Sequence, residues 1–385
     1  MRIAYVTETW LPSSDGIITR LLATIDQLLA AGHEVLVIAP RTDRPDLPGV
    51  VVRTVPTIHF SFVYGGQSWG LPLPRVARYL DEFRPDVVHL LNPVLIGIAG
   101  SLTARSRGYP LIASYHTDVA RYARDYRLSW IVPLLEAHLR RIHGAAHVNL
   151  ATSATGRLRL SSHGITESRL WPAGVDLDTY IPIDLMPEDR LPVRLPVRRT
   201  GSKPTALYVG RVAAEKELHR LQPLADPGSP FHLTIVGDGP ARQDLQRRFG
   251  PHVTFTGTLT GAALAAAYRD ADVFVFPSTT ETLGLVLMEA LASGLPVVAY
   301  DSPASRDLLS DCQAARLVPA DHHDQHDQQP TPGDGRLIAA ISELLSQPQD
   351  QLRRAARAHV EDQSWHRATS VLLDHYRTAI EAAHS

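Results

Sequence analysis

The sequence predicts an α/β protein built from two doubly wound domains. Its 385 residues are too many for one ordinary hydrophobic core, and a composition of 44% hydrophobic and 20% charged residues is that of a globular protein. Short apolar runs alternate with longer runs whose apolar residues repeat at helical spacing, the pattern of a parallel sheet covered by helices. The alternation stops at a proline-rich stretch and then restarts, which indicates a second domain of the same kind.

The first domain is expected at residues 1–180, and it opens with a strand, a helix that Gly32 ends, and a second strand. Its strands are expected at residues 2–6, 34–39, 86–91 and 110–115, and its helices at residues 17–29, 94–107, 129–143 and 154–163.

Prolines within residues 181–204 interrupt arginines and aliphatic residues in a way that neither a helix nor a central strand tolerates, so we expect a linker there. The second domain is expected at residues 205–364, followed by a last helix at residues 365–385. Its strands are expected at residues 205–209, 231–236, 253–256, 273–276 and 296–299.

Charge and cysteine content exclude several classes of protein. The formal net charge of −2 gives no global electrostatic reason to bind nucleic acid. The single cysteine excludes an internal disulfide framework, and no apolar run reaches the ~18 residues of a membrane span. With no signal-peptide pattern at the start, we expect a cytoplasmic protein whose membrane contact, if any, is peripheral.

The stretch at residues 279–294 is the most informative for function, because it carries two glutamates on either side of a helix start. Glu281 lies before Gly284 in a loop that follows a buried strand, whereas Glu289 lies in a helix that ends at Gly294. The start of a helix offers free backbone N–H groups and a positive dipole end. We therefore expect an anion site flanked by a hydroxyl-binding carboxylate, which is what a nucleotide sugar requires.

Two cations follow the first strand of the second domain. Arg211 and Lys216 could stabilise the negative charge that builds on a diphosphate leaving group, although surface ion pairs with Glu215 or Glu217 would explain them as well.

Glycines mark three further loops after strands. Gly237-x-Gly239 resembles a dinucleotide fingerprint, but Arg242 stands where the third glycine belongs, so nicotinamide binding is disfavoured. Gly237, Gly257 and Gly16 either let a ligand approach the backbone or only form tight turns, and the sequence leaves both interpretations open.

His116 ends a strand, where its ring could bond a sugar hydroxyl or simply pack in the core. We expect no metal role for Asp176 and Asp178, nor for the histidines and aspartates of residues 321–327, which indicate a solvated loop. No metal cofactor is expected.

Two stretches of the first domain could meet the acceptor or a membrane. Arginines surround the apolar run at residues 128–139, which is either a basic amphipathic surface for anionic lipid or a helix that packs on the sheet. The loop at residues 57–74 carries Tyr64 and Trp69, which with Asp118 are candidates for contacting the acceptor.

Taken together, these motifs resemble family 4 of the retaining glycosyltransferases, which has the two-domain fold called GT-B, with two Rossmann-like domains facing a cleft. The resemblance spans nearly the whole chain. Within the family, the chain is similar to the branch of bacterial lipid mannosyltransferases and sulfoquinovosyl transferases. It rests on residues 281–289, Gly210-Arg211 with Lys216, residues 236–240, His116-Thr117-Asp118 and Gly174-Val175-Asp176.

The resemblance implies a role for each matching residue. Glu281 would hold hydroxyls of the donor sugar, the backbone of Leu283, Gly284 and Leu285 its sugar and phosphate, and Glu289 the ribose. Arg211 and Lys216 would hold the diphosphate, His116 would contact the sugar, and Gly16 would lie against the phosphate. The last helix would cross back to the first domain.

The implied reaction moves a hexose from a UDP- or GDP-sugar to a hydroxyl of a lipid or small molecule by front-side attack, with retention of configuration. Two other classes of function were weighed. A non-catalytic nucleotide-sugar-binding relative should lack part of the set Arg211, Lys216 and Glu281, which is complete. An NAD-dependent oxidoreductase should carry an N-terminal glycine triplet, where this chain has only Gly16.

Overall fold

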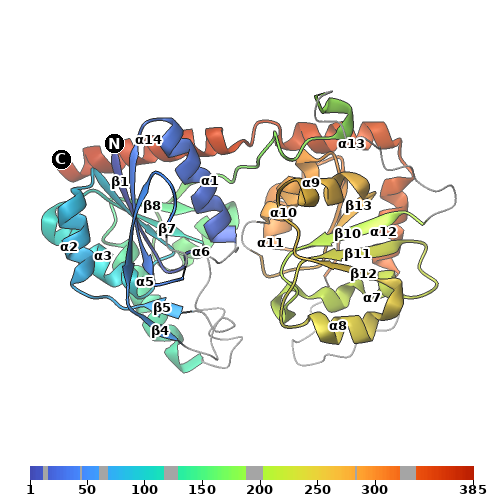
Figure 1. Ribbon diagram of the computed structural model, residues 1–385, viewed down its shortest axis with the longest axis horizontal. Helices are drawn as coiled ribbons and strands as arrows, with labels where there is room; N and C mark the ends of the chain where they lie inside the picture. Colours follow the sequence, from blue (N-terminus) through green and yellow to red (C-terminus); the bar gives the residue numbers. More distant parts are fainter. Residues whose placement is uncertain are drawn as a thin grey trace. The chain divides into compact units, whose positions relative to one another are not determined.

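The structure is a computed structural model, and it describes residues 1–11, 16–43, 46–59, 68–116, 129–187, 203–281, 284–320 and 335–385. The chain forms two compact units (Figure 1). One consists of Met1–Ala173 with Trp365–Ser385, and the other of Gly174–Ser364. Residues 174–180, which the sequence assigns to the first domain, belong to the second unit. Of the expected linker, residues 188–202 lie outside the described residues.

The first unit is a parallel sheet covered by helices on both faces. Within the described residues its strand order is β3-β2-β1-β6-β7-β8-β9, and each neighbouring pair is parallel. The strands are β1 Arg2–Thr7, β2 Glu34–Pro40, β3 Val50–Val55, β6 Val87–Leu91, β7 Leu111–Tyr115, β8 Val148–Ala151 and β9 Arg169–Leu170. The helices are α1 Gly16–Ala30, α2 Arg75–Phe83, α3 Ile96–Arg107, α5 Val132–His143, α6 Ala154–Ser162 and α14 Trp365–His384.

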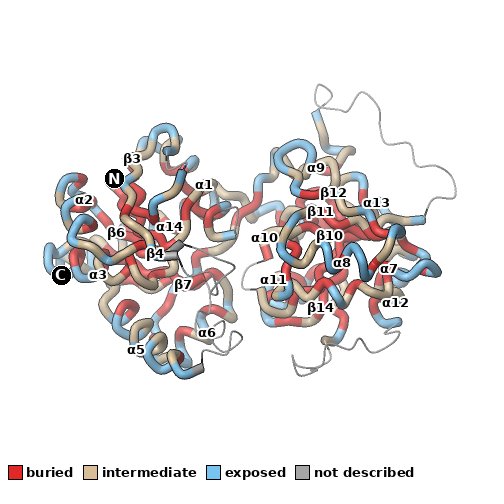
Figure 2. The backbone as a smooth tube through the Cα atoms, turned by 60° about the horizontal axis from the view of Figure 1, so that its bottom comes forward, coloured by how far each residue is buried: buried red, intermediate tan, exposed pale blue. Residues whose placement is uncertain are grey.

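Alternating residues of β1 divide the core of the first unit into two layers. Ile3 and Tyr5 pack in the layer that α1 and α14 cover, whereas Ala4 and Val6 pack in the layer of α2 and α3. Because both faces are covered, the central strands are mostly apolar and are buried, as Figure 2 shows in red. The last helix therefore completes the core of the unit in which the chain begins.

The second unit repeats this architecture. Its strand order among the described residues is β12-β11-β10-β13-β14-β15, again with parallel neighbours. The strands are β10 Thr205–Val209, β11 His232–Val236, β12 Thr254–Gly257, β13 Val273–Phe276, β14 Val297–Tyr300 and β15 Ala315–Val318. The helices are α7 Gln222–Ala225, α8 Arg242–Phe249, α9 Gly261–Asp270, α10 Leu285–Ala292, α11 Pro303–Leu309, α12 Arg336–Leu345 and α13 Gln349–Val360.

The expected strands and helices that fall in described residues are present, with ends that differ by a few residues. The sequence did not identify β3, β8, β15 or α2, which are short or lie at sheet edges. The aromatic loop expected at residues 57–74 contains a small antiparallel sheet, formed by β4 Thr57–His59 and β5 Ser68–Gly70. Within the described residues, no helix combines the length and apolarity that crossing a bilayer requires.

Each sheet has one position where the strand order reverses, between β1 and β6 in the first unit and between β10 and β13 in the second. At such a switch point the loops leave the two strands in opposite directions, and ligands of open α/β sheets bind in the resulting crevice at the carboxyl ends of the strands. The switch point of each unit is thus the place to look for function.

A buried carboxylate lies at the switch point of the first unit. Glu8 directly follows β1, and its Oε1 accepts hydrogen bonds from the backbone N–H groups of Val94 (2.9 Å) and Gly97 (3.1 Å) at the start of α3. Its Oε2 has no partner among the described residues. Burial raises the pKa of Glu8 to about 7, although the backbone N–H groups oppose that rise.

Replacing Glu8 by glutamine should therefore remove a pH dependence from the stability of the first unit. The folded state raises the pKa from 4.5 to about 7, so the folded state holds the proton more tightly. The contribution of this group to stability is complete below pH 4.5 and is lost as the pH rises through 7. The loss amounts to roughly 3 kcal/mol at about 1.4 kcal/mol per pKa unit.

We expect Glu8→Gln to match the wild type in urea unfolding at pH 5 and to be more stable at pH 8. The exposed Glu167 provides the control, because Glu167→Gln should change stability equally at both pH values. A Glu8→Gln effect that is the same at pH 5 and pH 8 would contradict the raised pKa.

Candidate active site

The loops that follow β10 and β13 meet at the switch point of the second unit. The Nζ of Lys216, from the first loop, forms an ion pair with Oε1 of Glu281, from the second. Each of these side chains is 23% exposed, so the pair is accessible from solvent yet partly desolvated. The structure thus brings together a cation and a carboxylate that the sequence singled out separately, at the position where this fold class binds ligands.

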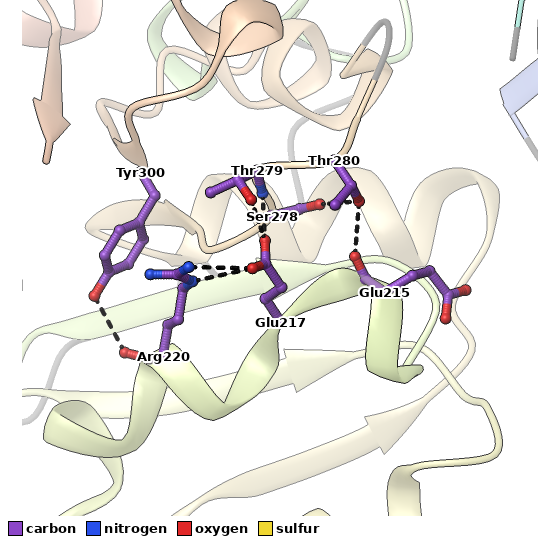
Figure 3. Close-up of polar contacts among 7 residues, drawn as sticks. All are labelled: Glu215, Glu217, Arg220, Ser278, Thr279, Thr280 and Tyr300. Atoms are coloured by element: carbon purple, nitrogen blue, oxygen red, sulfur yellow. Dashed lines mark hydrogen bonds and ion pairs between the residues drawn. The ribbon is translucent and has the colours of Figure 1, made fainter. Parts of the chain in front are cut away.

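Glu217, the residue after Lys216, fastens the two loops to each other (Figure 3). Its Oε2 accepts hydrogen bonds from the backbone N–H (2.6 Å) and the hydroxyl (2.7 Å) of Thr279. Its Oε1 accepts from Nη2 of Arg220 at 3.1 Å, and Thr280 donates its hydroxyl to the backbone oxygen of Glu215 at 2.9 Å. The backbone two residues before Glu281 is therefore fixed relative to Lys216.

The backbone of Glu217 has a φ of 52°, in the left-handed region that non-glycine residues rarely occupy. Such strain persists only where the surroundings determine the conformation. Here the turn sends Lys216 and Glu217 in different directions, so that Lys216 reaches Glu281 and Glu217 reaches Thr279. The sequence suggested an ion pair of Glu217 with Arg211 or Lys216. In the part of the chain that the structure describes, the ion pair found for this carboxylate is with Arg220.

Arg211 is the more exposed of the two expected cations. Its Nη1 lies 3.5 Å from Oε1 of Glu215, and the Arg211 side chain is 45% exposed. This is the surface ion pair that the sequence offered as the simpler explanation, and an exposed pair contributes little to stability. The backbone of Arg211 is nevertheless fixed, because the hydroxyl of the buried Tyr208 donates to its carbonyl oxygen at 3.0 Å.

Gly237 and Gly239 allow two loops to pass very close to each other. A Cβ on Gly237 would lie 1.9 Å from the backbone oxygen of Gly210, and one on Gly239 would lie 2.3 Å from that of Val212. The N–H of Gly237 also donates to the oxygen of Gly257 at 2.8 Å. Backbone packing therefore accounts for both glycines of the motif, and a contact of Gly237 or Gly257 with a ligand stays a prediction.

α10 begins at the site as the sequence predicts. Gly284 precedes it with a φ of 67°, and a Cβ there would lie 2.9 Å from the side chain of Leu287. Leu285 is the first residue of the helix, so its N–H group is among those without an intrahelical acceptor. Leu283 lies outside the described residues.

Glu289 is half-buried on α10 between two tyrosines. The hydroxyl of Tyr268 donates to its Oε2 at 2.8 Å, and that of Tyr180 also hydrogen bonds the carboxyl group. The two rings pack edge to face with centroids 5.6 Å apart, and Arg357 holds the backbone oxygen of Tyr180 at 2.7 Å. Burial raises the pKa of Glu289 to about 7. Because a carboxylate accepts about four hydrogen bonds, two tyrosines leave room for hydroxyl donors of a ligand.

In the first unit, His116 follows β7 and is buried. Its Nε2 lies 2.9 Å from the hydroxyl oxygen of Ser114, and its ring packs edge to face on Trp171. Burial and the nearby Arg20 hold the pKa of His116 well below its usual value of 6.5, so the ring is neutral at pH 7.

The remaining candidates of the first unit have less structure around them. Gly16 begins α1 and is exposed, and Trp69 lies half-buried in β5 opposite Ile58. Tyr64 and Asp118 lie outside the described residues, as does the histidine and aspartate cluster of residues 321–327.

Asp176, which the sequence set aside as a metal ligand, has a visible structural use. Its Oδ1 accepts from the backbone N–H groups of Asp178 (3.1 Å) and Thr179 (3.0 Å), which forms a tight turn.

Three residues at the site of the second unit were not predicted as site residues from the sequence: Glu217, Tyr180 and Tyr268. Glu217 directly follows Lys216, but no glycine marks its left-handed turn, so the sequence carries no signal of its bond to Thr279. The tyrosines are distant in sequence from Glu289, and nothing in the sequence pattern pairs them with it.

Glu217→Gln should loosen the loop that carries Glu281. The substitution keeps one oxygen acceptor but removes the charge that binds Arg220 and Thr279, so we expect a loss of roughly 1–3 kcal/mol in the free energy of unfolding. Hydrogen–deuterium exchange at residues 278–281 should become faster. Glu215→Gln is the matched control, since the Glu215 side chain pairs with the exposed Arg211 and its backbone oxygen is unchanged. Equal exchange in the two variants would refute the role of Glu217.

Comparison with known proteins identifies the family of the chain. Residues 14–179 match the family described as Glycosyltransferase Family 4, and residues 203–329 match Glycosyl transferases group 1. The chain is 37% identical to a GDP-mannose-dependent alpha-mannosyltransferase of Mycolicibacterium smegmatis, over 99% of this chain and 98% of that protein. It is 34% identical to a sulfoquinovosyl transferase of Arabidopsis thaliana, over 80% of this chain and 59% of that protein.

Among solved structures, the sucrose-phosphate synthase of Thermosynechococcus elongatus matches with a TM-score of 0.75 at 22% identity, covering 99% of both chains. The GT-B fold expected from the sequence is thereby confirmed. The chain belongs to glycosyltransferase family 4 and is a retaining glycosyltransferase that uses a nucleotide-sugar donor.

Proposed function

We propose that the enzyme transfers a mannosyl group from GDP-mannose to a hydroxyl of a lipid acceptor. The ion pair of Lys216 with Glu281 at the switch point carries this proposal, because it places a diphosphate-binding cation next to a hydroxyl-binding carboxylate. The choice of GDP-mannose is supported by the Mycolicibacterium relative and by two further relatives of the same printed name, at 37% and 32% identity.

Binding of the nucleotide sugar would give Lys216 and Glu281 new partners in place of each other. The diphosphate attracts Lys216, and Arg211 is exposed enough to turn from Glu215 toward the same anion. Glu281, released from Lys216, would accept hydrogen bonds from hydroxyls of the mannose. The exchange keeps both cations paired with an anion before and after binding, and it leaves Glu281 hydrogen bonded to hydroxyls.

Glu289 would accept hydrogen bonds from the ribose. With a pKa of about 7, it is partly protonated at neutral pH, and ribose hydroxyls favour its ionised form. Tyr180 and Tyr268 would hold the carboxylate in place.

The reaction would proceed by front-side attack of the acceptor hydroxyl on the anomeric carbon, as the family resemblance implies. The departing diphosphate oxygen takes the acceptor proton, so the protein supplies position and positive charge rather than a general base. Lys216 and Arg211 stabilise the leaving group. We expect no metal to be required, and EDTA-treated enzyme should keep its activity.

The two other functions considered find no support. A non-catalytic relative should have lost part of its charged set, but Arg211, Lys216 and Glu281 are all present. An oxidoreductase is inconsistent with membership of family 4.

The donor can be identified by thermal shift. GDP should raise the melting temperature well above the effect of UDP or ADP at equal concentration, because only the nucleotide that binds stabilises the folded state. With GDP-[14C]mannose and a lipid extract as acceptor, the product should be an α-mannoside. Stronger stabilisation by UDP or ADP would contradict the choice of donor.

Glu281→Gln should lower kcat/KM by roughly 100-fold or more, the scale of one lost transition-state contact, with an unchanged circular dichroism spectrum. Glu215→Gln, on the same surface, is the control and should stay within a few-fold of the wild type. A fully active Glu281→Gln enzyme would remove the basis of the assignment.

A surface of the first unit suits the approach to a lipid acceptor. Trp130 is 79% exposed and Leu134 is 70% exposed, one turn apart where the short 3-10 turn Ser129–Ile131 leads into α5. Ala137, Arg140 and Arg141 are exposed at the next helical positions. We propose that this stripe, residues 130–141, lies on an anionic membrane surface, with the apolar side chains inserted and the arginines at the phosphates.

Vesicle binding tests this stripe. The chain should co-sediment with vesicles of phosphatidylcholine and phosphatidylglycerol more than with phosphatidylcholine alone, and the double variant Trp130→Ser with Leu134→Ser should reduce binding by roughly 10-fold. Leu158→Ser is the matched control, because Leu158 on α6 is 72% exposed but lies outside the stripe. An equal effect of the control, or no preference for anionic vesicles, would contradict the proposal.

A further inference from the structure

A chain of five polar side chains crosses the core of the first unit and ends at His116. The hydroxyl of Tyr5 on β1 lies 2.7 Å from that of Tyr376 on α14, which lies 2.9 Å from Nδ1 of His89 on β6. The Nε2 of His89 lies 2.9 Å from the hydroxyl oxygen of Ser114 on β7, and Ser114 lies 2.9 Å from Nε2 of His116.

These five hydrogen-bonded side chains are shielded from water. The first four residues are completely buried, and His116 is 4% exposed. Trp171 covers the histidines, with its ring 5.4 Å from that of His89 and 5.7 Å from that of His116. In such surroundings each donor must find its acceptor inside the network, because an unpaired buried polar group costs about 1–3 kcal/mol.

The direction of the hydrogen bonds is set at Tyr5. Among the described residues, the acceptor within reach of its hydroxyl proton is the oxygen of Tyr376. If Tyr5 donates to Tyr376, then Tyr376 donates to Nδ1 of His89. In the opposite direction the Tyr5 proton would have no acceptor, so the first arrangement is favoured.

The same direction continues through Ser114. With Nδ1 of His89 accepting, the proton of that neutral ring sits on Nε2 and is donated to the oxygen of Ser114. Ser114 then donates its own proton either to Nε2 of His116 at 2.9 Å or to the backbone oxygen of Leu90 at 3.4 Å. The shorter contact favours His116.

His116 must then carry its single proton on Nδ1. A second proton is disfavoured by the burial of His116 and by the nearby guanidinium of Arg20, which stacks on Trp171 at 3.9 Å from its ring. Arg20 is itself buried and held by the backbone oxygens of Trp171 (2.5 Å) and Pro172 (2.6 Å). The charged and titratable groups that lower the pKa of the two histidines all oppose imidazolium: Arg20 acts on both, His375 on His89, and His89 on His116.

We propose that Tyr376 and Ser114 are positioning residues that fix His116 as the neutral Nδ1–H tautomer, a hydrogen-bond donor to an oxygen of the donor sugar. This inference rests on the proposed function for the identity of the ligand, but the tautomer follows from the first unit alone. A residue of the C-terminal helix thereby sets which nitrogen of His116 a substrate can use. His116 is a donor in this scheme and does not act as a general base.

The tautomer can be read directly by NMR of 15N-histidine-labelled protein. Protonated and unprotonated ring nitrogens have well-separated 15N shifts, and the His116→Gln spectrum assigns the His116 signals by their disappearance. We expect protonated Nδ1 in the wild type. Tyr376→Phe and Ser114→Ala, which interrupt the chain, should shift His116 toward the Nε2–H form or a mixture.

Tyr5→Phe is the matched control. It removes the same atom from a neighbouring buried tyrosine. The Tyr376 proton then has Nδ1 of His89 as its acceptor among the described residues, so Tyr376 still donates to His89 and the His116 tautomer should be unchanged. The melting temperatures of Tyr5→Phe and Tyr376→Phe separate any general loss of packing from the effect on His116. Nε2 protonation in the wild type, or equal spectra for Tyr5→Phe and Tyr376→Phe, would overturn the proposal.

Kinetics provide the second readout. Tyr376→Phe and Ser114→Ala should lower kcat by roughly 10- to 100-fold, the scale seen when a partner that orients a histidine is removed, while KM for the acceptor stays within a few-fold. Tyr5→Phe should keep wild-type kcat. If the wild type transfers no hexose but shows the Nδ1–H tautomer, the proposed function is contradicted, and the proposed control of the His116 tautomer is supported. If hexose transfer is intact but His116 carries its proton on Nε2, only the proposed control of the tautomer is contradicted.

Discussion

The site at the switch point of the second unit depends on the hydrogen bonds of the Glu217 carboxylate. It holds the loop after β13 to the loop after β10, and so it keeps Glu281 within reach of Lys216. Loops are the least constrained parts of an α/β fold, yet catalysis by a transferase requires the groups that hold its substrates to have fixed positions. A charge-assisted bond to a backbone N–H group provides that rigidity.

The fold could be predicted from the sequence because its signals are local. Apolar runs, helical spacing and glycine stops located β1, α1, β10 and α10 to within a few residues, and the motifs located Lys216 and Glu281. What the sequence could not supply are pairings between distant segments. Tyr376 lies 371 residues from Tyr5, and Tyr180 is distant in sequence both from Glu289 and from Arg357, which binds its backbone oxygen. Gly237 shows the converse, since a motif typical of ligand binding here also serves the packing of two backbones.

Both units keep ionisable groups away from water near their switch points, and in each unit the surroundings alter what those groups can do. Burial raises the pKa of Glu8 and Glu289 to about 7, while the pKa of His116 is lowered. Glu8 has become a cap for α3, whereas Glu289 retains capacity for hydroxyl donors. The same physical effect thus serves the capping of a helix in the first unit and, in the proposed function, ligand binding in the second, and the available hydrogen-bond partners decide which.

A crystal structure of the enzyme with GDP and mannose bound would test the central claim most directly. The account predicts the diphosphate on Lys216 and Arg211, with Glu281 separated from Lys216 and hydrogen bonded to mannose, while Glu217 remains on Thr279. A nucleotide bound elsewhere with the ion pair of Lys216 and Glu281 intact would contradict it.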